Sequence, residues 1–134
     1  MSRLLSPLHL CYVQDTAGAF LKNRDGRQLF KLLTPFSYQS DVLCETITVP
    51  SDFVTDLASI PRWPIVYIIF NGDADEAGVI HDYAYSTGTI SRLDSDKMLR
   101  EACLVLGVPA WKAWLIYQGV RLGGSKHYAK DYVV

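Results

Sequence analysis

The stretch Ala74-Asp75-Glu76-Ala77-Gly78-Val79-Ile80-His81-Asp82-Tyr83-Ala84-Tyr85 decides the fold, because it reads as the helix around which the rest of the chain is organised. Residues four apart share one face of a helix, so His81 and Tyr85 are expected to point the same way. Asp82 is rotated by about 100° from His81 and can serve a different partner. The stretch therefore predicts a helix that carries a candidate site.

Length and composition indicate one globular domain over residues 1–134. The chain is 49% hydrophobic and 20% charged, with a formal net charge of −1. This charge argues against a nucleic-acid-binding protein, which usually carries a basic patch. The three cysteines form no Cys-x-x-Cys motif, which argues against a disulfide framework or a structural zinc site. No apolar segment approaches about 18 residues, so we expect no transmembrane segment.

Residues from 1 to about 56 are expected to be mainly strands. The β-prone segments are separated by turn signals such as Asp25-Gly26, and they cover residues 8–13, 19–21, 28–33, 42–49 and 53–56. Residues 35–41 are expected to form a loop or an irregular strand. The pattern favours an antiparallel sheet built from β-hairpins.

Residues 57–73 are expected to form a rigid loop and a short helix, because Pro61 and Pro64 prevent a long helix. Three helices are expected over residues 74–124, followed by a tail at 125–134. Ser91 with Asp94 resembles a capping box, and Gly107 is expected to end the second helix. The third helix carries an aromatic stripe, predicted to belong to the core, of Trp111, Trp114 and Tyr117. Strands followed by helices indicate the α+β class.

His81 and Asp96 form the main candidate catalytic pair. The first two helices are joined by a short glycine-containing link and should be antiparallel neighbours. The two residues then differ in axial height by only about 3 Å. A carboxylate bonded to one imidazole nitrogen can make the histidine a general base. The alternative is that His81 is a core histidine and Asp96 a surface charge.

Asp82 and Tyr85 are secondary candidates on the same helix. Asp82 can ligate a hard cation such as calcium, or it can be a surface charge that pairs with Arg92 or Lys97. Tyr85 can donate a hydrogen bond to Asp96 or simply pack.

The segment Thr55-Asp56-Leu57-Ala58-Ser59-Ile60-Pro61-Arg62 supplies three further candidates. Ser59 is a candidate nucleophile, which would complete a triad with His81 and Asp96. Asp56 is a candidate cation ligand, and Arg62 can bind an anion or carboxylate of the substrate. The alternative is that Asp56 and Ser59 hold a tight loop through backbone hydrogen bonds.

An ordered set of motifs runs through most of the chain. It comprises Val49-Pro50-x-x-Phe53-x-Thr55-Asp56-x-Ala58-Ser59-Ile60-Pro61, His81-Asp82-x-x-Tyr85, Ser91-Arg92-x-x-x-Asp96, Gly107 and Tyr117-x-x-Val120-Arg121-x-Gly123. This set resembles a phage and prophage family catalogued as domain of unknown function 1353. The resemblance implies a bacteriophage or prophage origin and supplies no established activity.

His-Asp-x-x-Tyr followed by an aspartate on another helix is also similar to the phospholipase A2 superfamily. That resemblance implies that His81 activates water, Asp82 binds calcium and Asp96 orients the histidine. The Gly-rich calcium loop and the disulfides of the secreted enzymes are missing here, and the strand-rich first half is foreign to that fold.

Two hypotheses follow. The first is a small phage-encoded hydrolase that uses His81 and Asp96, with calcium as a candidate cofactor, on ester or amide substrates of the host envelope. The second is a non-enzymatic phage component that binds tail, other virion or host proteins and in which the motif residues are structural. Either protein would be made in the bacterial host cytoplasm and could become virion-associated.

Overall fold

The computed structural model describes residues 1–22, 28–55, 74–123 and 128, and it confirms the α+β class. Antiparallel strands occupy the first part of the chain, and three helices follow. The predicted rigid loop and short helix at 57–73 lie outside the described residues, as does the predicted tail apart from Tyr128. That the whole chain forms one domain stays a prediction.

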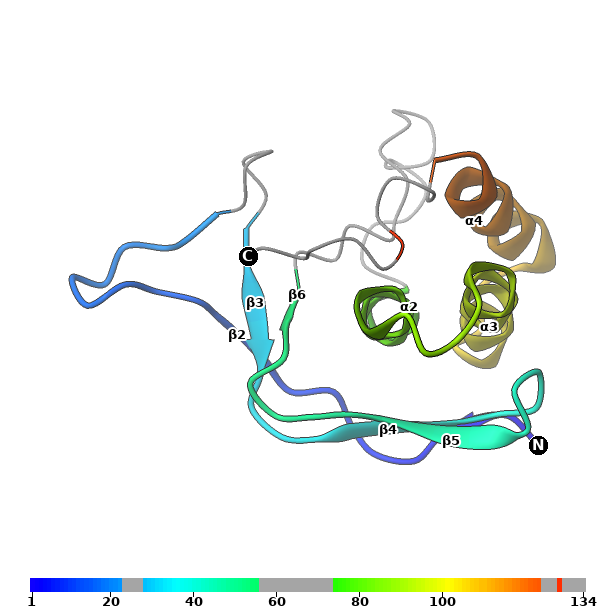
Figure 1. Cartoon of the computed structure of the whole chain (residues 1–134), viewed down its shortest axis with the longest axis horizontal. Helices are drawn as coiled ribbons and strands as arrows, with labels where there is room; N and C mark the ends of the chain where they lie inside the picture. Colours follow the sequence, from blue (N-terminus) through cyan, green and yellow to red (C-terminus); the bar gives the residue numbers. More distant parts are fainter. Residues whose placement is uncertain (23–27, 56–73, 124–127, 129–134) are drawn as a thin grey trace.

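The first sheet has the strand order β1-β4-β5, and all of its pairs are antiparallel. Its strands are β1 (Arg3–Leu4), β4 (Phe36–Ser40) and β5 (Glu45–Val49). Alternate side chains of β4 are buried, as expected for a strand with one face on the core. In Figure 1 this sheet lies beneath α2 and α3.

The second sheet has the order β2-β3-β6 and is also antiparallel. Its strands are β2 (Leu10–Tyr12), β3 (Phe30–Leu32) and β6 (Val54–Thr55). Just before β6, the ring of Phe53 packs edge-on against Tyr83 of α2, with centroids 5.4 Å apart. This contact and the short β5–β6 link bring Thr55 close to the first helix.

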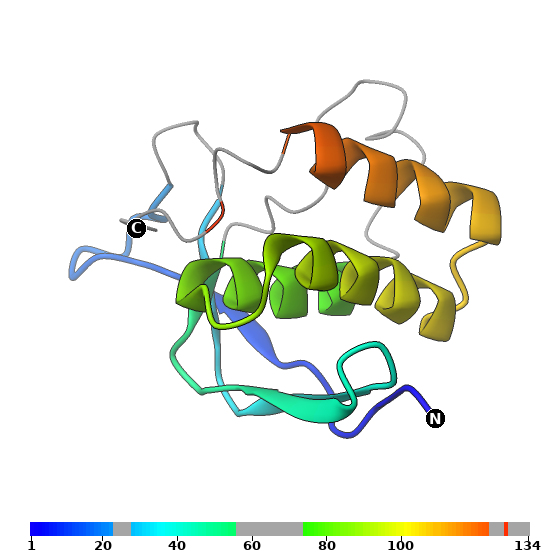
Figure 2. The ribbon, with the colours of Figure 1, turned by 45° about the vertical axis from the view of Figure 1, so that its right-hand side comes forward.

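The helices are α2 (Asp75–Thr87), α3 (Arg92–Val105) and α4 (Ala110–Gly123). Gly88 follows α2 with a positive φ of 64°, a conformation that glycine adopts without strain. The hydroxyl of Ser91 accepts a hydrogen bond from the Asp94 amide at 3.1 Å, so the predicted cap of α3 is confirmed. The helices lie side by side in Figures 1 and 2, with α3 between α2 and α4.

One hydrophobic core joins the first sheet to the helices. Its largest fully buried apolar side chains come from β3, β4, α2, α3 and α4, and they include Leu32, Phe36, Ile80, Met98, Leu99 and Ile116. At the edge of this core, Glu101 of α3 accepts hydrogen bonds from Tyr38 and Ser40, both at 2.8 Å, and from the Val42 amide at 2.9 Å. Glu101 therefore anchors the β4–β5 turn to α3.

Three predictions need correction. The segment expected as a loop or irregular strand is the regular strand β4, which is buried on one face. The strand expected at 19–21 is reduced to an isolated bridge between Gln14 and Phe20. The aromatic stripe is not core: Trp111 and Trp114 are exposed because α4 packs on α3 through the opposite side, where Ala113, Ile116 and Val120 lie.

Candidate functional site

Helix α2 places His81 and Tyr85 on one buried face, as their spacing predicts. The two rings lie one helical turn apart, with centroids separated by 4.0 Å. His81 is 1% exposed and Tyr85 is 2% exposed. Both side chains point toward α3, where they meet the same carboxylate.

That carboxylate is Asp96, which is fully buried in the first half of α3. Its Oδ1 lies 2.7 Å from His81 Nε2, and the hydroxyl of Tyr85 donates a hydrogen bond to the same oxygen. Its Oδ2 accepts a hydrogen bond from Arg121 Nη1 at 2.8 Å. Asp96 therefore connects α2, α3 and α4 through three donors.

The electrostatics of the cluster favour an ionised Asp96. Burial acts to raise the pKa of this carboxyl group, but the hydrogen bonds from His81, Tyr85 and Arg121 and the charge of His81 outweigh it and hold the pKa below its ordinary value. The pKa of the Tyr85 phenol is raised, first by burial and then by its bond to Asp96. An ionised carboxylate can only accept, so His81 carries a proton on Nε2.

Asp82 faces the second sheet instead of the Asp96 cluster. The hydroxyl of Thr55 in β6 donates a hydrogen bond to Asp82 Oδ2, and both residues are buried. This bond connects α2 to the strand that precedes the predicted site loop. Among the residues that the structure describes, no group of three or more histidine, cysteine, aspartate or glutamate side chains is placed to hold a metal ion. The role of Asp82 as a calcium ligand stays a prediction.

The remaining sequence candidates, Asp56, Ser59 and Arg62, lie outside the described residues. The structure thus brings together His81, Tyr85 and Asp96, and it places Asp82 on a neighbouring face of α2.

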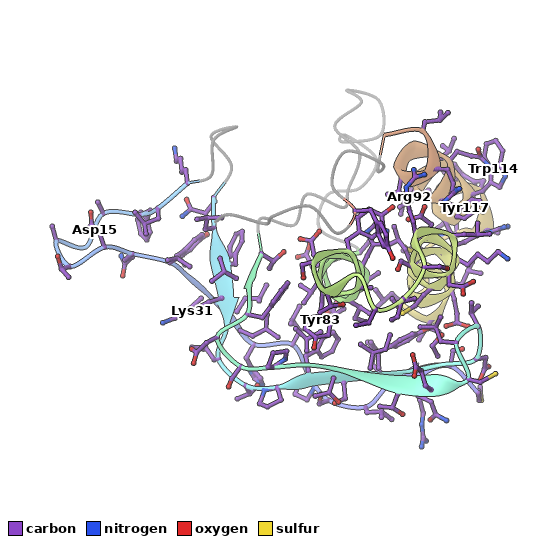
Figure 3. All side chains as sticks on the ribbon, in the orientation of Figure 1. Asp15, Lys31, Tyr83, Arg92, Trp114 and Tyr117 are labelled. Carbon is purple, nitrogen blue, oxygen red and sulfur yellow. The ribbon has the colours of Figure 1, made fainter. Side chains whose placement is uncertain are left out.

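Arg121 stands out in the sequence only as a member of the motif set, and no local pattern indicates its link to Asp96. Arg92 was also missed as a structural element. Its Nη2 donates to the carbonyl oxygens of Val120 at 2.9 Å and Arg121 at 2.6 Å, so it holds the last turn of α4. Arg92 lies between α3 and α4 in Figure 3. Both arginines belong to the motif set, and Arg92 was otherwise named only as an alternative partner of Asp82.

Tyr128 closes the same end of the helices. Its hydroxyl donates to the Ile90 carbonyl oxygen at 2.5 Å, and its ring packs edge-on against Tyr85 with centroids 5.3 Å apart. The link between α2 and α3 is therefore covered by a residue from beyond α4.

Within the described parts of the chain, no helix is both long and apolar enough to cross a membrane.

Comparison with known proteins gives one curated relative. The chain is 36% identical over 110 residues to "Uncharacterized protein y4jT" of Sinorhizobium fredii. The alignment covers 81% of this chain but only 32% of the relative, so the chain spans about a third of that protein's length. No solved structure matches the chain. A family model described as "Protein of unknown function (DUF1353)" matches residues 30–120, and the chain belongs to this family.

Proposed function

We propose that this protein is a small hydrolase in which His81 is the general base and Asp96 is the carboxylate that orients it. The observation that carries the proposal is the 2.7 Å contact between His81 Nε2 and Asp96 Oδ1, in a cluster that keeps Asp96 ionised. With Nε2 bonded to Asp96, the nitrogen that exchanges protons is Nδ1.

The proposed reaction is general-base hydrolysis of an ester or amide of the host envelope. His81 Nδ1 takes a proton from water, or from the hydroxyl of Ser59, as the oxygen attacks the substrate carbonyl carbon. Asp96 stabilises the imidazolium that forms. The proton then passes to the leaving oxygen or nitrogen as its bond to carbon breaks, which restores neutral His81. On the Ser59 route the product of these steps is an acyl-serine, and a water molecule deprotonated by His81 then attacks its carbonyl carbon, which releases the acid and returns the proton to the Ser59 oxygen. The similarity to phospholipase A2 supports this division of roles and adds Asp82, with Asp56, as candidate calcium ligands.

A second candidate is a non-enzymatic phage component, either a virion or tail accessory protein or a host-takeover binding protein. One observation favours it specifically. Asp96 is completely buried, and its two oxygens accept hydrogen bonds from three side chains on two other helices. A saturated buried network of this kind is what a purely structural cross-link requires. The resemblance to phage proteins supports either candidate, together with synthesis in the host cytoplasm and later association with the virion.

The test is hydrolysis of aryl esters, phospholipids and acyl amides, each with calcium and with a chelator. The matched variants are His81→Gln, which removes the base, and His9→Gln, which changes an exposed histidine far from the cluster. We expect turnover to fall by about 10²–10⁴-fold in His81→Gln only. Equal turnover in the two variants, or no turnover on any class of substrate, would exclude the hydrolase.

Nitrogen-15 chemical shifts of the histidine rings provide a readout that does not depend on the substrate. The wild-type protein should show His81 protonated on Nε2 when neutral, because the carboxylate of Asp96 can only accept. A neutral His81 that carries its proton on Nδ1 would contradict the proposal, in which Nε2 donates to Asp96 and Nδ1 accepts the proton of the nucleophile.

A further inference from the structure

The outer surface of α3 and α4 combines exposed apolar side chains with basic ones. On α3, residues spaced by four, three and four share one exposed face, and they are Leu93, Lys97, Arg100 and Leu104. On α4, a similar spacing exposes Trp111, Trp114 and Leu122, which are 55%, 48% and 71% exposed. We call these seven residues the α3–α4 face.

The two helices present these residues on the same side of the molecule. The guanidinium of Arg100 lies 6.0 Å from the centre of the Tyr117 ring, which bridges the exposed flanks of α3 and α4. In Figure 3, Trp114 and Tyr117 lie on the outer side of α4, away from the sheets. The face is therefore continuous across the helix pair.

Acidic side chains are kept away from this face. Helix α4 contains no aspartate or glutamate. In α3, Asp96 is buried, and Glu101 bonds to Tyr38 and Ser40 on the side of the first sheet. Asp94 follows Leu93 directly and is therefore rotated by about 100° from it around the helix, toward the flank of Glu101. Arg121 lies between the helices, but its guanidinium is paired with the buried carboxylate of Asp96 and so adds no net charge to this face. The described residues thus leave this face with cations alone.

We propose that the α3–α4 face binds the surface of an anionic phospholipid bilayer. Tryptophan and leucine partition into the boundary between headgroups and acyl chains, while lysine and arginine bind lipid phosphates. The charge is complementary to anionic lipid. The same charge disfavours a second copy of the protein as the partner, because packing two such faces together would place Lys97 and Arg100 next to the like charges of the other copy. The inference does not depend on the hydrolase, since none of the seven residues belongs to the His81–Asp96 cluster.

The test is sedimentation of the full-length protein with phosphatidylcholine vesicles that either contain or lack phosphatidylglycerol. Each basic side chain near an anionic surface strengthens binding roughly fivefold, so Lys97 and Arg100 together should give a preference of roughly 25-fold for the anionic vesicles. Tryptophan fluorescence should shift to shorter wavelength on binding, because Trp111 and Trp114 leave water.

Two pairs of substitutions test the two components of the face. Trp111→Ser with Trp114→Ser should abolish the binding, and Lys97→Glu with Arg100→Glu should reduce it by at least tenfold. The matched controls are Leu33→Ser, an exposed apolar residue elsewhere, and Arg3→Glu with Lys22→Glu, which produces the same change in net charge.

Three outcomes would overturn the inference. One is no sedimentation with either kind of vesicle, and another is equal binding by the face variants and the controls. The third is a dimer in sedimentation equilibrium that the double tryptophan substitution dissociates, because a second copy would then cover the face. We expect His81→Gln to bind the vesicles as tightly as the wild type does. This result would show that vesicle binding does not depend on the proposed catalytic base, so each proposal can fail without the other.

Discussion

Replacing Asp96 by asparagine should lower the free energy of unfolding by about 3 kcal/mol near neutral pH. Asp96 accepts three hydrogen bonds, from His81, Tyr85 and Arg121. A hydrogen bond to a charged group contributes about 1.5–3 kcal/mol and a neutral one about 0.5–1.5, so each bond loses roughly 1 kcal/mol. The midpoint of thermal unfolding should fall by on the order of 10 °C.

The effect should depend on pH with a defined sign. The pKa of Asp96 in the folded protein lies below its ordinary value, which is about 3.9 in an unfolded chain. The stabilisation by the charged carboxylate is therefore fully present above about pH 4 and is lost as the pH falls through the folded pKa. The difference between wild type and Asp96→Asn should narrow only below about pH 4.

Chemical denaturation at several pH values measures this difference, and Asp52→Asn is the matched control. Asp52 is exposed, and its positive φ of 66° is one that asparagine tolerates. A difference below about 0.5 kcal/mol at neutral pH would refute the reasoning from charge-assisted bonds. So would a difference that stays constant down to pH 3 or so, because the carboxylate charge would then contribute nothing.

Three further predictions concern other parts of the fold. Burial and a neighbouring carboxylate raise the pKa values of the Tyr85 and Tyr38 phenols. The stabilisation that each neutral phenol provides is therefore present below about pH 10 and is lost as the pH rises above it. In urea denaturation at alkaline pH, Tyr85→Phe should lose less of its free energy of unfolding than the wild type does. Burial raises the pKa of the Cys103 thiol to about 12, so a disulfide reagent near pH 8 should label exposed Cys44 at once and Cys103 only as fast as the protein unfolds. Glu101→Gln should cost about 1–2 kcal/mol and speed hydrogen exchange at the β4–β5 turn. The glutamine nitrogen cannot accept a hydrogen bond, so either the Val42 amide or the hydroxyls of Tyr38 and Ser40 lose their acceptor.

The helical half could be predicted closely because its signals are local. Ser91, Gly88 and Gly107 mark helix ends through capping and positive φ, and both effects act within a few residues. The contact between His81 and Asp96 could also be foreseen, because a short link fixes two helices as antiparallel neighbours and sets their relative height.

The strands could be predicted less well because their partners are distant in sequence. Strand β1 has only two residues and pairs with residues 38 and 39 of β4, so no local pattern marks it. Strand β4 contains two serines and a glutamine, which obscure the alternation, yet Ser40 is buried because Glu101 of α3 accepts its hydrogen bond. Tertiary contacts override local preference at both strands.

The rest of the site depends on the packing of α4 against α3. Arg121 reaches Asp96, and Arg92 reaches the end of α4, only in the observed register of the two helices. The prediction that Trp114 belongs to the core is wrong for the same reason. A large apolar residue is usually buried, but the side of α4 that meets α3 carries small and branched residues.

The family match covers the central strands of both sheets and most of the helical half. It begins at Phe30, the first residue of β3, and ends at Val120, and so leaves out β1 and β2. Each of these two is an edge strand, whereas β3 and β4 are the central strands of their sheets and lie inside the match. The matched unit therefore contains both central strands and the His81–Asp96 contact, and Arg121 joins that contact from one residue beyond it.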